Sequence, residues 1–217
     1  MQENASSASE SGNPFPAPPP QQNYQVAVDK AVEALRSQSA EQLAWLGATG
    51  EGKLWQLPAL EDVLTVDPAS GKMTVSDGNE CHRSWQIIVL HYLAVSTRPE
   101  SRSPETTFAD LPGGRSYNKV HRGRVIGRLC GTAGRDEKTL RGAAEKLGTQ
   151  WVQAGDLAFD LRVFPRVPIR LIWHAADDEF PPSATFLLPG NIESFLCIED
   201  IVVLSECIVS RLCGRPF

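Results

Sequence analysis

Hydrophobic residues along the chain repeat with two different periods, and the changes of period divide the sequence into blocks of helix and blocks of strand. From Tyr24 to Leu35 apolar residues recur every three or four positions, which predicts an amphipathic helix. Ser39 and Gln42 form the pattern of a capping box, so a second short helix is expected there. The runs KLWQLP, DVLTVD and KMTVSD, within residues 53–77, are short and partly alternating and are separated by turn signals such as DPASGK, which predicts an antiparallel meander.

The rest of the chain continues in blocks. Residues 83–96 are apolar almost all round, which is typical of a buried central helix. Further elements are expected as helices at 116–130, 136–147 and 198–212 and as strands in the runs TQWVQ, LAFDLRVF, IRLIWHA and 186–188. Helices and strands do not alternate strictly, so the pattern predicts an α+β fold, with an antiparallel or mixed sheet packed with several helices.

The first 22 residues differ in composition from everything that follows. They are rich in Ser, Asn, Gln, Ala and Pro, as in PFPAPPPQQ, and cannot bury enough apolar surface to offset the entropy of ordering. Residues 1–22 are therefore expected to be a disordered tail, and residues 23–217 a single α+β domain. PAPPP could alternatively serve as a polyproline ligand for the aromatic groove of a partner.

Composition and charge restrict the classes of function. The 217 residues carry a formal net charge of −5, which argues against a general nucleic-acid binder. The N-terminus lacks the pattern of a secretory signal, and the longest apolar run, at 87–95, is far shorter than the ~20 residues of a membrane span. We therefore expect a cytoplasmic protein with neither nucleic acid nor membrane as a partner. The five cysteines contain no C-x-x-C pair, so no metal site is expected, and no motif specifies a cofactor or a catalytic residue.

A strongly basic segment offers the first candidate site. Between Asp110 and Asp136 the chain has no acidic residue. In a regular helix, side chains at i, i+4, i+7 and i+11 share a face. Two arginines four residues apart are separated by about 6 Å along the helix axis, so both guanidinium groups can bind one anion. The glycines of LPGG would let an anion approach the helix N-terminus. The candidate residues are Gly113, Gly114, Tyr117, His121, Arg124 and Arg128. A solvated helix that pairs with the protein's own acids is the alternative.

A cluster of three acids offers the second candidate. Asp177, Asp178 and Glu179 stand between two apolar runs and are followed by Phe180 and two prolines. Neighbouring side chains of an extended segment point to opposite faces, so at most two of these carboxylates can converge on one ion. The cluster therefore indicates either a metal or acid–base site or a polar turn with its carboxylates in water.

The motifs also resemble those of a known family. The succession LHYL, FADLPGG, AGDLAFDLRVFPRVPIRLIWHAADDEFPPSATFLL and IEDIVVL resembles the prokaryotic family catalogued as domain of unknown function 3786, over residues 24–213. The resemblance implies no particular activity, because none is established for the family. Its members occur mainly in anaerobic bacteria and archaea, and some carry a fused iron–sulfur domain. This chain lacks the closely spaced cysteines of such a domain, so the resemblance implies only a role near anaerobic redox or one-carbon metabolism.

Three functions are consistent with these patterns. The first is a binding or accessory protein that recognises an anionic small molecule or an acidic protein partner through the basic helix. The second is an enzyme in which the acids 177–179 and the basic residues 117–128 meet across one cleft. The third is an assembly subunit that uses the apolar rim around Phe180.

Overall fold

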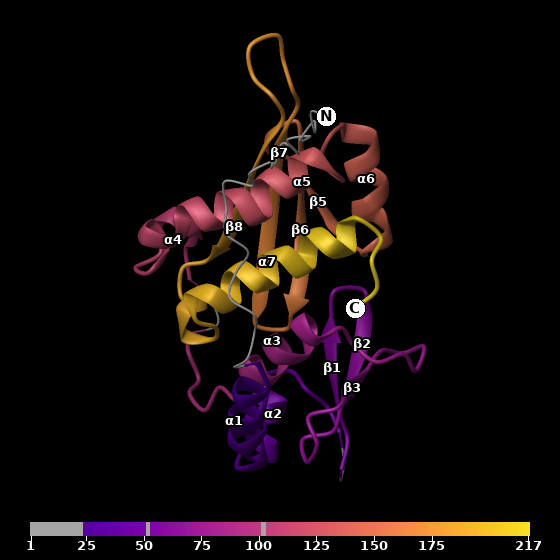
Figure 1. Cartoon of the computed structure of the whole chain (residues 1–217), viewed down its shortest axis with the longest axis vertical. Coiled ribbons are helices and arrows are strands. Elements are labelled where there is room, and N and C mark those ends of the chain that lie inside the picture. The colour runs from indigo at the N-terminus through magenta and orange to yellow at the C-terminus, as the bar shows by residue number, and fades with distance from the viewer. Residues whose placement is uncertain (1–23, 51–52, 101–102) are drawn as a thin grey trace, which may run out of the picture.

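The computed structural model describes residues 24–50, 53–100 and 103–217, and the tail expected at residues 1–22 lies outside these ranges. Within them the chain forms two antiparallel sheets and a set of helices, which confirms the α+β class (Figure 1). The N-terminal elements are α1 (Tyr24–Arg36), α2 (Ala40–Trp45), β1 (Trp55–Ala59), β2 (Asp62–Val66), β3 (Met73–Thr74) and α3 (Arg83–Leu93). The larger part comprises β4 (Glu105–Thr107), η1 (Phe108–Asp110), α4 (Gly114–His121), η2 (Arg122–Gly127), α5 (Arg128–Gly131), α6 (Glu137–Lys146), β5 (Gln150–Val152), β6 (Leu157–Phe164), β7 (Val167–His174), β8 (Ser183–Pro189), η3 (Ile192–Ser194) and α7 (Ile198–Leu212).

The larger sheet has the strand order β4-β8-β7-β6-β5, and every pair is antiparallel. Alternate residues of β6 and β7, such as Phe159 and Leu171, are fully buried, whereas Arg162 and Pro168 on the opposite face are exposed. This alternation is typical of a sheet that is covered on one face. The structure adds β4, which sequence patterns did not indicate, and extends the strand expected at 186–188 to the whole of β8.

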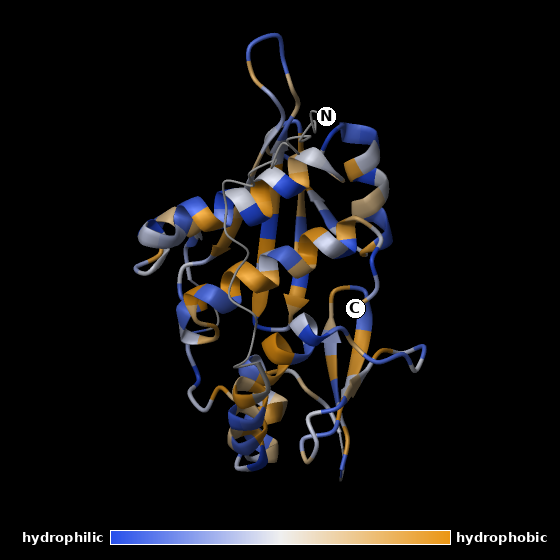
Figure 2. Cartoon of the chain, viewed as in Figure 1, coloured by the Kyte–Doolittle hydropathy of each residue, from blue (hydrophilic) through white to orange (hydrophobic). Residues whose placement is uncertain are grey.

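Helix α7 runs across the buried face of this sheet and forms the centre of the core. Its inward residues, such as Ile201 and Ile208, are fully buried, and it packs against α3, α4, η2 and α6. The continuous helix from α4 through η2 to α5 lies beside α7 in Figure 1 and shares the same layer. Figure 2 shows how densely hydrophobic residues occupy β6, β7 and α7. The layer of helices on the sheet therefore brings the basic segment against α7.

The basic helix is not a regular α-helix. Residues Arg122–Gly127 form a π-helical turn, η2, between α4 and α5. π-turns are rare and occur frequently at functional sites. The wider turn interrupts the regular α-helical repeat that was assumed from the sequence over these residues.

Candidate functional site

The two glycines before the basic helix are required by close packing. A Cβ atom at Gly114 would lie 1.7 Å from the carbonyl oxygen of Phe108, and one at Gly113 would lie 2.4 Å from Cγ1 of Ile198. A carboxylate oxygen of Glu193 lies 3.0 Å from the same Cβ position at Gly113, so the N-terminus of α4 already faces an acid of the protein. Packing alone thus accounts for the Gly-Gly pair that sequence analysis associated with an anion.

His121, at the end of α4, is buried between aromatic rings. It is 4% exposed, stacks on Phe108 with ring centroids 4.2 Å apart, and meets Phe186 edge-on at 6.3 Å. Its Nε2 atom has no hydrogen-bond partner among the described residues. Burial lowers the pKa of His121 to about 4, so the imidazole is neutral at pH 7.

Arg124 is held by two carboxylates of α7. Its Nε and Nη2 atoms donate to the two carboxylate oxygens of Glu206 at 2.9 and 2.6 Å, and its Nη1 atom donates to Glu199 at 3.0 Å. Glu199 also accepts a hydrogen bond from Tyr117, and this bond is the main cause that raises the pKa of the tyrosine. Tyr117 and Arg124 therefore lie together, as expected, but they face the acids of α7.

Arg128 lies one turn further along and has a different environment. Its Nη2 atom donates to the hydroxyl oxygen of Ser210 at 3.0 Å, and no ion pair connects its guanidinium group to a carboxylate of the described residues. The side chain is partly buried and lines a cavity of about 350 Å³ between α5, α7, the start of α3 and residues 215–217. Arg128 is therefore a partly buried cation with several unused donors that faces an accessible space.

The other groups around this cavity are both polar and apolar. Arg215 lines it without an ion pair within the described part of the chain, and Ser84 lies in the first turn of α3, where its backbone N–H already donates to Nδ1 of His82 at 3.2 Å. Glu206 also lines the cavity, and its carboxylate pairs with Arg124, which it shares with Glu199. The apolar lining is formed by Trp85, Val203, Cys207, Pro216 and Phe217.

Among the described residues that line this cavity, the one thiol is that of Cys207, which is buried. Burial, the largest cause, raises the pKa of Cys207 to about 12, so it stays protonated at neutral pH. Sequence reasoning pointed to Arg128 but missed Ser84, Ser210 and Arg215. Ser84 precedes the basic helix in a different element, and Ser210 and Arg215 follow Arg128 by more than 80 positions, so no local spacing connects them.

The acid cluster lies elsewhere. Asp177, Asp178 and Glu179 are exposed in the long loop between β7 and β8, which projects from the end of the sheet in Figure 1. Asp177 Oδ1 accepts hydrogen bonds from the backbone N–H groups of Glu179 at 2.9 Å and Phe180 at 2.7 Å. The three acids line neither the Arg128 cavity nor the other cavities described below. The structure thus gives Asp177 the role of organising a turn.

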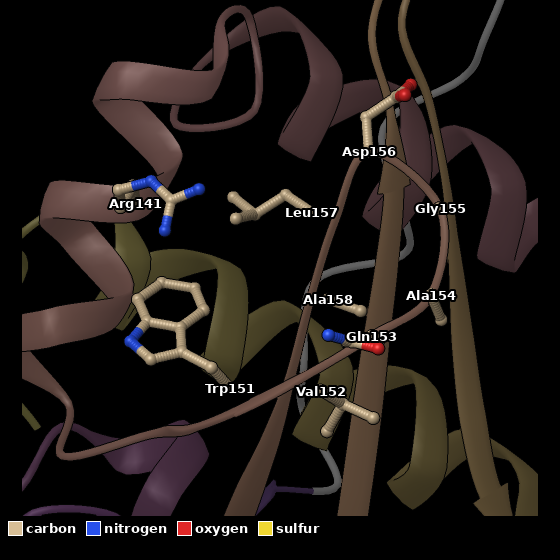
Figure 3. A pocket seen from close by; sticks show the side chains of 9 residues that line it. All are labelled: Arg141, Trp151, Val152, Gln153, Ala154, Gly155, Asp156, Leu157 and Ala158. Atoms are coloured by element: carbon tan, nitrogen blue, oxygen red, sulfur yellow. The ribbon is translucent and has the colours of Figure 1, made fainter.

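A shallow pocket of about 470 Å³ lies between α6 and the β5–β6 hairpin. Figure 3 shows Arg141 of α6 facing Trp151 of β5, with Gln153 and Asp156 on the hairpin turn. The guanidinium group of Arg141 lies 5.0 Å from the centroid of the indole and donates to Glu137 at 2.6 Å. Asp156 accepts from the backbone N–H of Ala175 at 2.8 Å. Arg141 and Asp156, the two charged residues of this pocket, are thus already hydrogen-bonded to other groups of the protein.

His91, in the central helix α3, forms a hydrogen bond with an acid of α7. His91 Nδ1 lies 2.9 Å from Oδ2 of Asp200, the residue that also accepts from the backbone N–H of Cys197. In the described part of the chain, no group of three or more His, Cys, Asp or Glu side chains is placed to hold a metal ion. The helices formed by the described residues include none that is long and apolar enough to cross a bilayer.

Comparison with known proteins identifies the family. The family model DUF3786, described as a domain of unknown function, matches residues 38–211. The match covers most of the 217 residues, so the chain belongs to this family, as the resemblance implied. No curated protein and no solved structure matches the chain.

Proposed function

We propose that the protein is a binding protein for a small anionic molecule, and that Arg128 is the residue that recognises the anion. The observation that carries the proposal is the contrast between two arginines of one helix. Arg124 is bound by Glu199 and Glu206, whereas Arg128 faces a cavity and, among the described residues, is held only by the hydroxyl of Ser210. A partly buried arginine without a carboxylate partner is a favourable site for a phosphate or carboxylate group.

The cavity also indicates the shape of the ligand. The anionic group would accept hydrogen bonds from Arg128 and from the hydroxyl of Ser84, near the positive end of the α3 dipole. The remainder of the ligand would contact Trp85, Val203 and Phe217, which form apolar walls. A volume of about 350 Å³ suits a metabolite with one acidic group and an apolar body.

Binding is favoured over catalysis by the state of the ionisable groups around the cavity. The thiol of Cys207 has a pKa raised to about 12 by burial, and the carboxylate of Glu206 is occupied by Arg124. Neither is arranged as a nucleophile or a general base. A cytoplasmic setting belongs to the same proposal, and so does the link to anaerobic redox or one-carbon metabolism that the family resemblance implies.

The experiment is a thermal unfolding series with phosphate, sulfate and short-chain carboxylates at constant ionic strength. The wild type should be stabilised by at least one of these anions, by about 2.7 kcal/mol when the anion is present at ~100 times its Kd. Arg128→Ala should lose the effect and remain folded. Arg115→Ala, which removes an exposed arginine of α4 that lines none of the cavities described above, is the matched control.

A wild type that responds to no anion, or an Arg128→Ala variant that responds as the wild type does, would refute the proposal.

A further inference from the structure

A second surface, formed by residues that do not line the Arg128 cavity, lies at the free edge of β8. The neighbouring strand β4 pairs with Leu187, Leu188 and Pro189 and then turns away into η1. The first half of β8, residues 183–186, is paired with β7 on one side, and no strand of the described residues pairs with it on the other. An edge strand with no neighbour presents backbone hydrogen-bonding groups to another chain.

The register identifies which of these groups point outward. The N–H of Gly190 donates to the carbonyl oxygen of Pro104 at 2.8 Å, so Gly190 directs its hydrogen bonds toward β4. In an antiparallel strand the direction alternates from residue to residue. The backbone N–H and C=O groups of Leu188, Phe186 and Ala184 are therefore also directed toward the β4 side of the strand. Beyond the end of β4, no backbone partner of Ala184 or Phe186 is found on this side in the described part of the chain.

A groove runs along this edge. It has a volume of about 320 Å³ and lies between residues 183–186 of β8 and the helix formed by α4 and η2. The helix contributes Asn118, His121, Arg122 and Ile126, and Phe108 lies at the end where β4 turns away. The buried Nε2 atom of His121 has no partner in the described structure. A strand edge that faces a helix across a groove is the arrangement that domains use to bind peptides by adding a strand.

The charge of the helix selects the kind of peptide. Arg115, Lys119 and Arg122 are exposed, and none of them forms an ion pair with another described residue. The segment between Asp110 and Asp136 contains no acid that could neutralise them. The chain's own residues 1–22 are a poor occupant, because their five prolines cannot donate backbone hydrogen bonds.

We propose that this groove binds an extended acidic segment of a partner protein, which adds to the large sheet as a strand beside Ala184 and Phe186. Alternate side chains of the segment would face Ile126 and Phe108, while its acids would pair with Arg122 and its neighbours on the helix. The site is separate from the anion cavity, so either proposal can fail without the other.

The test uses a fluorescein-labelled synthetic peptide, acetyl-(Glu-Val)₃-Glu-amide, and reads binding by fluorescence polarisation. The acidic peptide should bind saturably at concentrations below about 1 mM, and the same peptide with lysine in place of glutamate should not. Methylating alternate backbone nitrogens of the acidic peptide should weaken binding at least about tenfold, because strand addition needs their N–H groups. Tight binding of the methylated peptide, or no binding of the acidic one, would overturn the proposal.

Two protein variants locate the site. Ala184→Pro removes an N–H that points away from β7, so it should leave the β7–β8 ladder intact and abolish peptide binding. Ala184→Ser, which keeps the N–H, is the matched control and should bind as the wild type does. Arg122→Glu should weaken binding at least about tenfold without changing the melting temperature. Unchanged affinity in both Ala184→Pro and Arg122→Glu, or a concentration-dependent dimer that competes with the peptide, would contradict a partner strand at this edge.

Discussion

Replacing Arg124 with alanine should destabilise the fold more than replacing Arg128, although the two arginines are one helical turn apart. Arg124 makes a two-pronged contact with Glu206 at 2.9 and 2.6 Å and a third contact with Glu199 at 3.0 Å. Removing it would leave two carboxylates of α7 close together without a counter-charge. Arg128 would lose one hydrogen bond to the neutral hydroxyl of Ser210.

The magnitudes follow from the exposure of these groups. The Arg124 side chain is 40% exposed and Glu199 47%, so their pair contributes no more than about 1 kcal/mol. Glu206 is 24% exposed, and its two charge-assisted bonds contribute about 1–2 kcal/mol after allowance for solvent screening. Arg124→Ala should therefore lower the free energy of unfolding by about 2 kcal/mol, or ~4–8 °C in Tm for a chain of this size. Arg128→Ala should cost less than about 1 kcal/mol.

Urea and thermal unfolding of the wild type and the two variants measure this difference. A double-mutant cycle with Arg124→Ala and Glu206→Ala supplies the control, because the coupling energy isolates the pair. The destabilisation of Arg124→Ala should also shrink in high salt, which screens the ion pairs. If Arg128→Ala destabilises the protein as much as Arg124→Ala does, Arg128 has a structural partner and the reasoning that leaves it free for a ligand is wrong.

Three further outcomes are expected. The pKa of His121 is lowered by burial from 6.5 to about 4, so between these pH values the unfolded chain binds a proton that the folded chain does not. The free energy of unfolding should therefore fall by roughly 1.4 kcal/mol per pH unit as the pH drops from 6.5 to 4. His121→Phe should remove that slope in urea unfolding measured across this pH range, and an unchanged slope would contradict the role given to His121. Gly114→Ala should cost at least about 2 kcal/mol, since its Cβ would meet the Phe108 carbonyl, whereas Gly123→Ala, whose Cβ meets nothing, should be neutral or slightly stabilising in the same melts. Asp177→Ala should cost less than about 1 kcal/mol because the turn is exposed, and a larger loss would show that the loop packs against the domain.

Periodicity alone identified most of the elements that build the core. The apolar run at 83–96, the alternating strands around Phe159 and Leu171 and the closing helix at 198–212 all follow from local pattern, because burial on one face imposes a period on the sequence. The short strand β4 carries no such period. It consists of Glu105, Thr106 and Thr107 at a sheet edge, where pairing with β8 decides the conformation.

The candidate site was harder to predict, for a physical reason. The spacing of Tyr117, His121, Arg124 and Arg128 was interpreted as one face open to a ligand, whereas three of these residues contact α7 and His121 is buried against aromatic rings. His121 turns toward Phe108 and Phe186, Arg124 toward Glu206, and Arg128 toward the cavity. Which arginine finds an acid depends on the position of α7, some 80 residues away in sequence, and no local pattern records that contact.

The most direct test of the central claim is the position of a heavy anion in crystals of the protein soaked with tungstate. Anomalous diffraction should show a peak in the cavity between Arg128, Arg215 and the first turn of α3, with an anion oxygen within about 3.2 Å of the Arg128 guanidinium group. Crystals of Arg128→Ala should lack that peak. Anomalous density only at exposed arginines such as Arg115, with the cavity unoccupied in the wild type, would contradict the assignment of Arg128 as the anion-binding residue.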